Sequence, residues 1–218
     1  MIYTFWEGDM PAYIKLCIAT WKLPFKVLNY KNYPVSDEVK KFTLPQVADY
    51  VRVHVLRDEG GYWLDADTIM LSDELPKENI AGDIETRSNS IGFLHTEKQS
   101  EMFTAWADYQ DRVIADKVKN TWDLLGNAFT DKYVKEHKEI TIHDITDYQP
   151  ERKLPVNMTR YDKYIKYYFE SGYTLDKISA KTMLMLHNSW TPKGFKNLSE
   201  YGVLNTGCTL SNILKELV

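Results

Sequence analysis

Two aspartates separated by one residue, Asp65 and Asp67, are the residues of this sequence most suited to chemistry. They follow Gly60-Gly61 and a short apolar run at residues 62–64. In an extended strand, residues at i and i+2 point to the same face, so the two carboxylates would lie close together. Clustered carboxylates repel each other unless a cation lies between them, and Mg²⁺ and Mn²⁺ prefer oxygen ligands. The spacing therefore predicts a divalent metal site at the end of a strand.

A helix is predicted directly before this strand. Thr43 and Gln46 have the spacing of a capping box, and Gly60 is suited to ending a helix. Asp49 and Arg52, at i and i+3, share one face of it. From the helix alone we favour a surface ion pair, which contributes less than about 1 kcal/mol to stability.

The first fifty residues alternate between strand and helix patterns. Residues 2–6 and 25–28 are rich in β-branched and aromatic residues, and residues 14–21 between them carry an apolar stripe at helical spacing. This alternation predicts an α/β fold, a Rossmann-type mixed sheet flanked by helices. In such sheets, ligands bind outside the carboxyl ends of the strands, where the two aspartates are predicted to lie. We expect a single domain over residues 1–218.

Composition excludes several classes of function. The chain has 218 residues and a net charge of −4, which argues against a nucleic-acid partner. The two cysteines, Cys17 and Cys208, are far apart in sequence and form no metal or redox motif; a reducing compartment is favoured over a disulfide between them. The first residues lead directly into a strand pattern, so we expect no secretion signal, and the sequence has no apolar run long enough to cross a bilayer. We expect a cytoplasmic protein, with the inner face of the membrane as the alternative.

Three blocks of the sequence resemble the DXD sugar transferases of glycosyltransferase family 32. The first joins residues 48–52, Ala-Asp-Tyr-Val-Arg, to residues 60–67, Gly-Gly-Tyr-Trp-Leu-Asp-Ala-Asp; Trp63 stands where tyrosine is common. The second is Phe5-Trp6 at the end of the first strand, and the third is residues 187–190, His-Asn-Ser-Trp, a shorter form of the late block. The family includes initiating mannosyltransferases and capsular polysaccharide transferases, and it is similar here to the large glucosylating toxins. Residues 71–181 match weakly.

The resemblance implies a metal-dependent glycosyltransferase of the GT-A fold. Such an enzyme moves a hexose from a nucleotide sugar to a glycan or lipid-linked acceptor with retention of configuration, here in surface polysaccharide synthesis. UDP-hexose is the favoured donor, and GDP-mannose is the alternative. On this basis residues 1–75 would bind the donor, residues 76–180 would face the acceptor, and residues 181–218 would close the site.

The resemblance also implies roles for the residues of the first block. Asp67 would bind Mn²⁺ or Mg²⁺ directly, and Asp65 would reach the ribose, the sugar or the metal through water. Both aspartates would act by stabilising charge on the diphosphate leaving group. Asp49 and Arg52 would hold sugar hydroxyls, with Arg52 also near the diphosphate. No general base is assigned.

The other two blocks would complete the donor site. Trp6 would stack on the base, and the backbone of Phe5 would pair with the edge of the base. His187 or Ser189 would complete the metal shell, although a packing role explains His187 equally well. In addition, Trp190 would donate its indole N–H to a phosphate, and Lys193 would add positive charge.

Two further segments have alternative interpretations. Asn127 either faces the sugar or starts a helix. The aromatic and basic residues 161–169 either touch a membrane surface, as a peripheral contact near a lipid-linked acceptor, or pack in the core; core packing is favoured.

Two other functions are alternatives to the glycosyltransferase. Residues 64–68 also resemble the D-x-D-x-T motif of haloacid-dehalogenase-type phosphatases, in which the first aspartate is a nucleophile. That class needs a later acidic pair, and Asp83 has no partner at the required spacing. The remaining alternative is a sugar- or metal-binding module without turnover.

Overall fold

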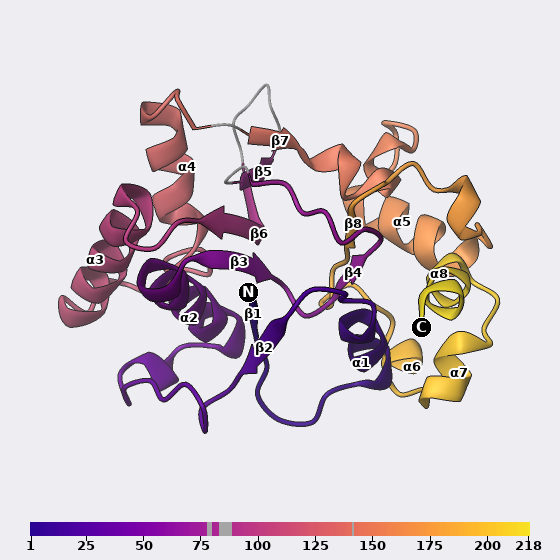
Figure 1. Cartoon of the computed structure of the whole chain (residues 1–218), viewed down its shortest axis with the longest axis horizontal. Coiled ribbons are helices and arrows are strands. Elements are labelled where there is room, and N and C mark those ends of the chain that lie inside the picture. Colours follow the sequence, from indigo (N-terminus) through magenta and orange to yellow (C-terminus); the bar gives the residue numbers. More distant parts are fainter. Residues whose placement is uncertain (78–79, 83–88, 141) are drawn as a thin grey trace. The chain divides into compact units, whose positions relative to one another are not determined.

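The computed structural model describes residues 1–77, 80–82, 89–140 and 142–218. The chain forms two compact units, each built from three segments (Figure 1). The first unit contains Met1–Gly8, Pro24–Asp65 and Pro76–Ile145, and the second contains Asp9–Leu23, Ala66–Leu75 and Thr146–Val218. The expected single domain, with its donor, acceptor and closing segments, stays a prediction.

The first unit is built on a mixed sheet with strand order β2-β1-β3-β6-β5-β7 in the described residues. β1 runs parallel to β2 and β3, β6 is antiparallel to β3 and β5, and β5 runs parallel to β7. This arrangement confirms the mixed α/β fold class. The bounds of the strands are β1 Ile2–Phe5, β2 Phe25–Leu28, β3 Gly61–Leu64, β5 Ile80–Gly82, β6 Asn89–Thr96 and β7 Ile142–Asp144.

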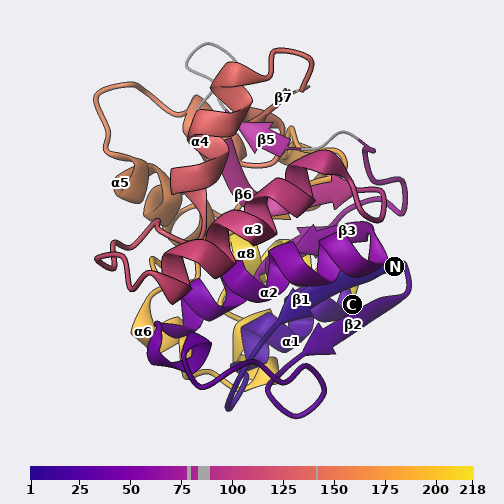
Figure 2. The same cartoon turned by 90° about the vertical axis from the view of Figure 1, so that its left-hand side faces the viewer.

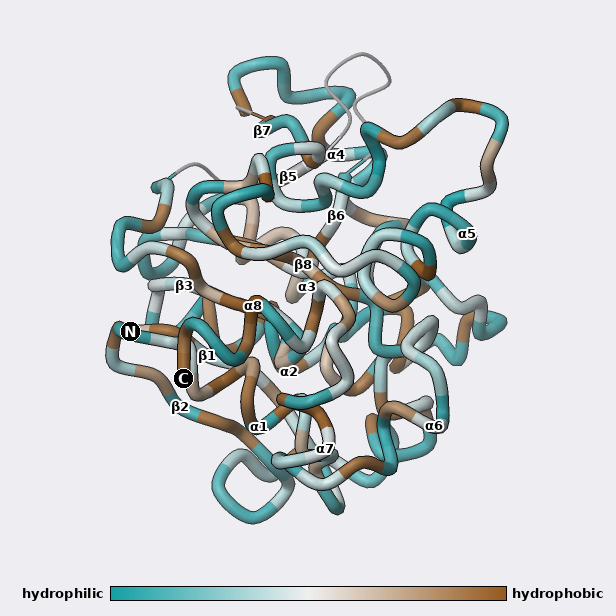
Figure 3. Tube along the Cα trace, turned by 90° about the vertical axis from the view of Figure 1, so that its right-hand side faces the viewer, coloured by the Kyte–Doolittle hydropathy of each residue, from teal (hydrophilic) through white to brown (hydrophobic). Residues whose placement is uncertain are grey.

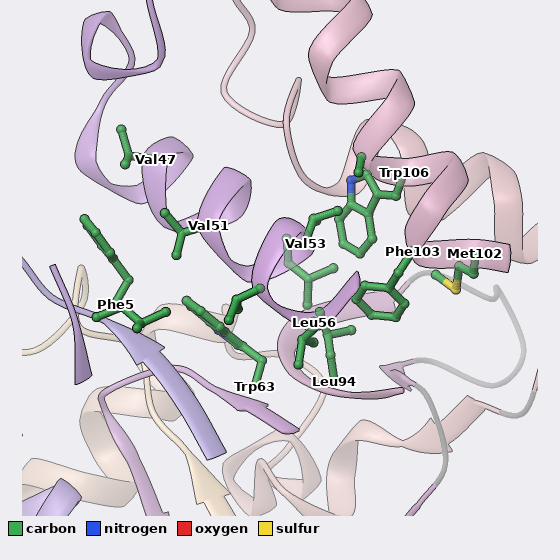
Figure 4. Close-up of a cluster of buried hydrophobic side chains, with 14 of the residues drawn as sticks. Phe5, Val47, Val51, Val53, Leu56, Trp63, Leu94, Met102, Phe103 and Trp106 are labelled. Atoms are coloured by element: carbon green, nitrogen blue, oxygen red, sulfur yellow. The ribbon is translucent and has the colours of Figure 1, made fainter. Parts of the chain in front are cut away.

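The α-helices described in this unit are α2 Leu44–Glu59, α3 Glu101–Ala115 and α4 Asn127–Glu136. α2 packs against α3 and against β1 and β3 (Figure 2). The capping box is confirmed, because the side-chain oxygen of Gln46 accepts hydrogen bonds from the Thr43 N–H at 3.3 Å and its hydroxyl at 2.9 Å. Figure 4 shows the core between these elements, where Leu56 of α2 and Phe103 of α3 lie beside Leu94 of β6.

The second unit contains a two-stranded antiparallel sheet, β4 (Thr68–Met70) with β8 (Met183–Met185). The segment after α1 (Ala12–Ala19) is bound to β4, because the Trp21 indole N–H donates to the Thr68 carbonyl at 2.8 Å. The other α-helices of this unit are α5 Arg160–Ile165, α6 Lys193–Lys196, α7 Glu200–Leu204 and α8 Thr209–Leu217. Hydrophobic and hydrophilic residues alternate along α8, as expected for a helix with one buried face (Figure 3).

Short helical turns complete the chain. The 3₁₀ turns are Val39–Lys41, Ile145–Asp147, Pro150–Lys153 and Leu175–Lys177, and Lys166–Glu170 is π-helical. Tyr164 and Tyr168 are fully buried, which confirms core packing for this aromatic segment, whereas Tyr161 is exposed. In the described part of the chain, no helix is both long enough and apolar enough to cross a membrane.

The turn into β3 depends on Gly61, which has φ +97°. A Cβ at this position would lie 2.6 Å from the Met1 carbonyl oxygen. We therefore expect Gly61→Ala to lower the free energy of unfolding by roughly 1–3 kcal/mol, as measured by urea denaturation. Gly194→Ala is the control, because a Cβ there meets no atom within 4 Å. Equal stability of the two variants would contradict the steric argument.

Candidate functional site

A buried arginine lies between two carboxylates in the first unit. Arg52 Nη2 is 3.1 Å from Asp49 Oδ1 and 3.1 Å from Asp65 Oδ1. The side chains of Arg52 and Asp49 are 5% and 11% exposed, so the expectation of a surface ion pair is wrong. Asp49 and Arg52 lie on α2, and Asp65 directly follows β3. One guanidinium thus connects the helix to the first aspartate of the D-x-D pattern.

Further contacts fix Arg52 and Asp65. Arg52 Nη1 donates to the Ile91 carbonyl of β6, and the guanidinium lies 5.0 Å from the Trp63 ring centroid. The Trp63 indole N–H donates to Asp65 Oδ1 at 2.9 Å. Asp65 Oδ1 therefore accepts two hydrogen bonds, while the side chain as a whole is 42% exposed. The carboxylate is held at one oxygen and accessible to a ligand.

The pKa of Asp49 is raised to about 7, mainly because burial disfavours the charged form. Arg52 lowers this pKa and Asp65 raises it. The backbone at Gly126, directly before α4, also passes close to Asp49. A Cβ on Gly126 would lie 2.9 Å from Asp49 Oδ2 and 2.8 Å from the Ile91 side chain. Only glycine fits at position 126 without displacing these atoms.

The other predicted donor residues of this unit are in different surroundings. Phe5 is buried and packs edge-on against Tyr30, with ring centroids 5.5 Å apart. Trp6 directly follows β1, and its backbone N–H donates to the Leu28 carbonyl at 2.9 Å. Asn127 is the first residue of α4, and its side-chain N–H₂ donates to the Asn89 carbonyl at 2.7 Å. The position of Asn127 at the start of α4 agrees with the alternative in which it starts a helix.

Asp67 belongs to the second unit. Residues 66 and 67 form a turn between β3 and β4, so the extended-strand argument for a shared face is wrong at Asp67. Asp67 is 8% exposed, and its Oδ2 accepts the Asn188 N–H at 2.6 Å. Burial lowers the pKa of Lys196, and nearby Asp67 opposes that shift.

The late block, residues 187–190, follows β8 and forms a tight turn in which the Trp190 N–H donates to the His187 carbonyl at 2.9 Å. The ring centroids of His187 and Trp190 are 4.1 Å apart. The pKa of His187 is lowered to about 4, first by burial and then by the positive charges of Arg160 and Arg152. Ser189 is exposed, and so is Lys193 at the start of α6.

In the described residues, no three histidine, cysteine or acidic side chains are arranged to hold a metal ion. This does not decide the matter for Mg²⁺, which commonly uses one or two carboxylates and completes its shell with water and phosphate oxygens. Asp65, whose side chain is 42% exposed and whose Oδ1 alone accepts the described hydrogen bonds, fits that pattern.

Comparison with known proteins identifies the family. Residues 1–198 match the model of the capsular polysaccharide synthesis protein family. The chain belongs to this family. The match confirms the capsular polysaccharide part of the resemblance seen in the sequence. No curated protein sequence matches the chain. Among solved structures, the chain is similar to the PaToxG glycosyltransferase, with a TM-score of 0.48 and 15% identity over 62% of this chain and 67% of that chain.

Sequence patterns did not single out several residues that contact or surround the predicted site residues. Trp63 was noted only as an altered aromatic, yet its indole N–H holds Asp65. The only sign in the sequence that Gly126 lies at the site is its position directly before Asn127, a predicted donor-binding residue. No sequence pattern near the aspartates predicts the Ile91 carbonyl or Lys196 as neighbours. The first is a backbone group, and the second is far from the aspartates in sequence.

Replacing Arg52 tests whether its contacts with Asp49, Asp65 and the Ile91 carbonyl stabilise the fold. Lysine has one charged nitrogen and cannot contact Asp49, Asp65 and the Ile91 carbonyl with a planar fork. We expect Arg52→Lys to lower the free energy of unfolding by about 3 kcal/mol in urea denaturation, as for a broken buried ion pair.

Arg57→Lys on the same helix is the matched control. Arg57 pairs with Asp58 at 2.8 Å, but both side chains are more exposed. The expected loss is under about 1 kcal/mol. If Arg57→Lys cost as much as Arg52→Lys, the buried bridge would not be the important contact.

The raised pKa of Asp49 predicts a pH dependence of stability. Between the ordinary pKa of 3.8 and about 7, the unfolded chain is ionised at Asp49 while the folded chain is protonated there. The stabilisation that the folded chain gains from its higher affinity for the Asp49 proton is complete below about pH 4, and it is lost as the pH rises to 7. Compared with Asp49→Asn, the wild-type free energy of unfolding should therefore fall over this range, by at most about 1.4 kcal/mol per unit of pKa shift. Urea denaturation of both proteins at several pH values measures the difference. A constant difference would refute the shift.

Proposed function

We propose that this protein is a metal-dependent glycosyltransferase of the GT-A fold that acts in surface polysaccharide synthesis. It transfers a hexose from a nucleotide sugar, with UDP-hexose favoured over GDP-mannose, to a glycan or lipid-linked acceptor with retention of configuration. The observation that carries the proposal is Asp65, held by buried Arg52 at the carboxyl end of β3 with part of its carboxylate accessible. Membership of the capsular polysaccharide synthesis family supports the biological role.

Asp65 and Asp67 would bind Mn²⁺ or Mg²⁺. One residue joins them, so covalent geometry alone keeps their Cα atoms within about 7 Å. Two carboxylates are enough for a hard divalent ion that also binds substrate phosphates. When bound, the ion supplies Lewis-acid stabilisation of the diphosphate leaving group.

Arg52 is better suited to positioning than to binding the sugar. Its guanidinium already contacts Asp49, Asp65 and the Ile91 carbonyl, and the residue is 4% exposed. A donor fixed in advance costs little reorganisation when the ligand arrives. We infer that Arg52 sets the orientation of the Asp65 carboxylate, and that sugar hydroxyls are held by other groups.

The remaining roles follow from exposure. Trp6 and Trp190 are partly exposed, so stacking on the base and donation to a phosphate remain open to them. Phe5 is buried, which is consistent with a role for its backbone alone. Ser189 and Lys193 are exposed and could approach the phosphates.

A donor screen tests the function directly. The thermal unfolding midpoint would be measured with Mn²⁺ and a panel of UDP- and GDP-sugars, followed by hydrolysis assays on the sugars that raise it. Metal-dependent release of the nucleotide supports the glycosyltransferase. Hydrolysis of p-nitrophenyl phosphate without sugar-nucleotide hydrolysis would instead favour the phosphatase. Binding without turnover over a broad acceptor screen would favour a binding module.

Asp67→Asn tests the metal-binding aspartate. The amide keeps an oxygen that can accept the Asn188 N–H, so the fold should be retained. We expect Mn²⁺-dependent hydrolysis of the donor to fall at least roughly a hundredfold, because charge stabilisation of the leaving group is lost. Asp73→Asn, an exposed aspartate in the same unit, is the matched control and should retain activity. Full activity in Asp67→Asn would remove this residue from the mechanism.

A further inference from the structure

A buried amide connects an arginine to the late-block histidine within the second unit. Gln149 is 1% exposed. Arg152 Nε lies 2.6 Å from Gln149 Oε1, and Gln149 Nε2 lies 3.2 Å from His187 Nε2. Both ends of the Gln149 side chain therefore have a defined partner.

The chemistry of the three groups fixes the position of the hydrogen on His187. Arginine only donates hydrogen bonds, so the oxygen of the Gln149 amide must face Arg152. The amide nitrogen, which also only donates, then faces His187 Nε2. That ring nitrogen must accept, so the neutral imidazole carries its hydrogen on Nδ1. If the ring were protonated, the Gln149 Nε2–H and the His187 Nε2–H would point at each other, and neither could accept a hydrogen bond.

This tautomer is unsuited to the predicted role of His187 as a metal ligand. The lone pair of Nε2 is used by Gln149, and Nδ1 carries a hydrogen instead of a lone pair. The nearby charges also disfavour a cation, because Arg152 and Arg160 are the charged groups that lower the pKa of His187. The Arg160 guanidinium lies 5.7 Å from the Trp190 ring centroid, and Trp190 packs against His187.

We propose that His187 binds a phosphate-type oxyanion through its Nδ1–H, with Gln149 and Arg152 as positioning residues and Arg160 as a nearby positive charge. The inference deepens the proposed function, because such an oxyanion is present in the diphosphate of a nucleotide sugar and in the phosphate of a lipid-linked acceptor. It replaces the metal-ligand role predicted for His187, so Ser189 remains the predicted candidate in this block.

The tautomer is measurable without any substrate. Long-range ¹H–¹⁵N correlation spectra of the whole protein above pH 7 distinguish a ring nitrogen that carries hydrogen from one with a lone pair, and His187→Asn assigns the signals. We expect the hydrogen on Nδ1. A wild-type spectrum with the hydrogen on Nε2 overturns the proposal, whether or not the protein proves to be a glycosyltransferase.

Gln149→Glu tests the positioning role. A carboxylate at this position can accept from Arg152 on one oxygen and from His187 Nε2–H on the other, so the hydrogen should move to Nε2. His95 and His137 are internal controls, because their Nδ1 atoms lie 2.9 Å from the carbonyls of Lys77 and Tyr133 and should keep their hydrogens. An unchanged His187 signal in this variant would show that Gln149 does not set the tautomer.

The ligand is tested by titration with inorganic pyrophosphate, UDP and geranyl phosphate, with the His187 Nδ1–H signal as the readout. We expect the signal to shift on binding, and the tighter of UDP and geranyl phosphate identifies the donor or the acceptor as the source. Arg160→Gln should weaken binding by about tenfold, as for one charge-assisted contact. Lys166→Gln, an exposed cation in the adjacent turn, is the control and should bind as wild type does. No shift with any of the three probes overturns the oxyanion assignment.

Discussion

The first unit depends on keeping one arginine charged inside the protein. Removing a guanidinium from water is costly unless its hydrogen-bonding groups are paired. The two terminal nitrogens of Arg52 meet this requirement with two carboxylates and a carbonyl, and the guanidinium lies over Trp63, whereas Nε is buried without a hydrogen-bond partner among the described residues. These partners come from α2, β6 and the end of β3, so the contact links helix and sheet at the position where a ligand is expected. Asp65 is consequently oriented by the folded structure before any ligand binds.

The charge of this assembly favours a further cation. One guanidinium faces two carboxylates, and the raised pKa of Asp49 reflects burial together with the nearby charge of Asp65. A cation bound at the accessible side of Asp65 would offset that repulsion and lower the pKa of Asp49. Metal binding and deprotonation of Asp49 would thus favour each other, which links the buried acid to the proposed site although it is 8% exposed.

Local patterns were sufficient to predict the elements around this site. The capping box at Thr43, the glycine pair at the end of α2 and the apolar run of β3 are each determined by neighbouring residues. Periodicity also placed Asp49 and Arg52 on one face, but it could not show that the face is buried. That burial depends on β6, whose Ile91 carbonyl is 39 residues from Arg52 in sequence.

The same limit explains the late block. The sequence placed His187 after a strand, as the structure confirms, and the residue type suggested a metal ligand. Which ring nitrogen carries hydrogen depends on Gln149, which is 38 residues away and was not singled out by any motif. A histidine with a free lone pair and one with a fixed Nδ1–H have the same sequence signature but opposite ligand preferences.

The two polar assemblies therefore have different chemical preferences. Around Asp65 two carboxylates share one guanidinium, which suits a divalent cation, whereas around His187 the neighbouring side chains are Arg152 and Arg160, which suit an anion. Arg52 and the Trp63 indole both donate to Asp65 Oδ1, so the orientation of this carboxylate is set by the fold. A carboxylate that is oriented in this way is suited to binding a hard divalent cation, which prefers oxygen ligands.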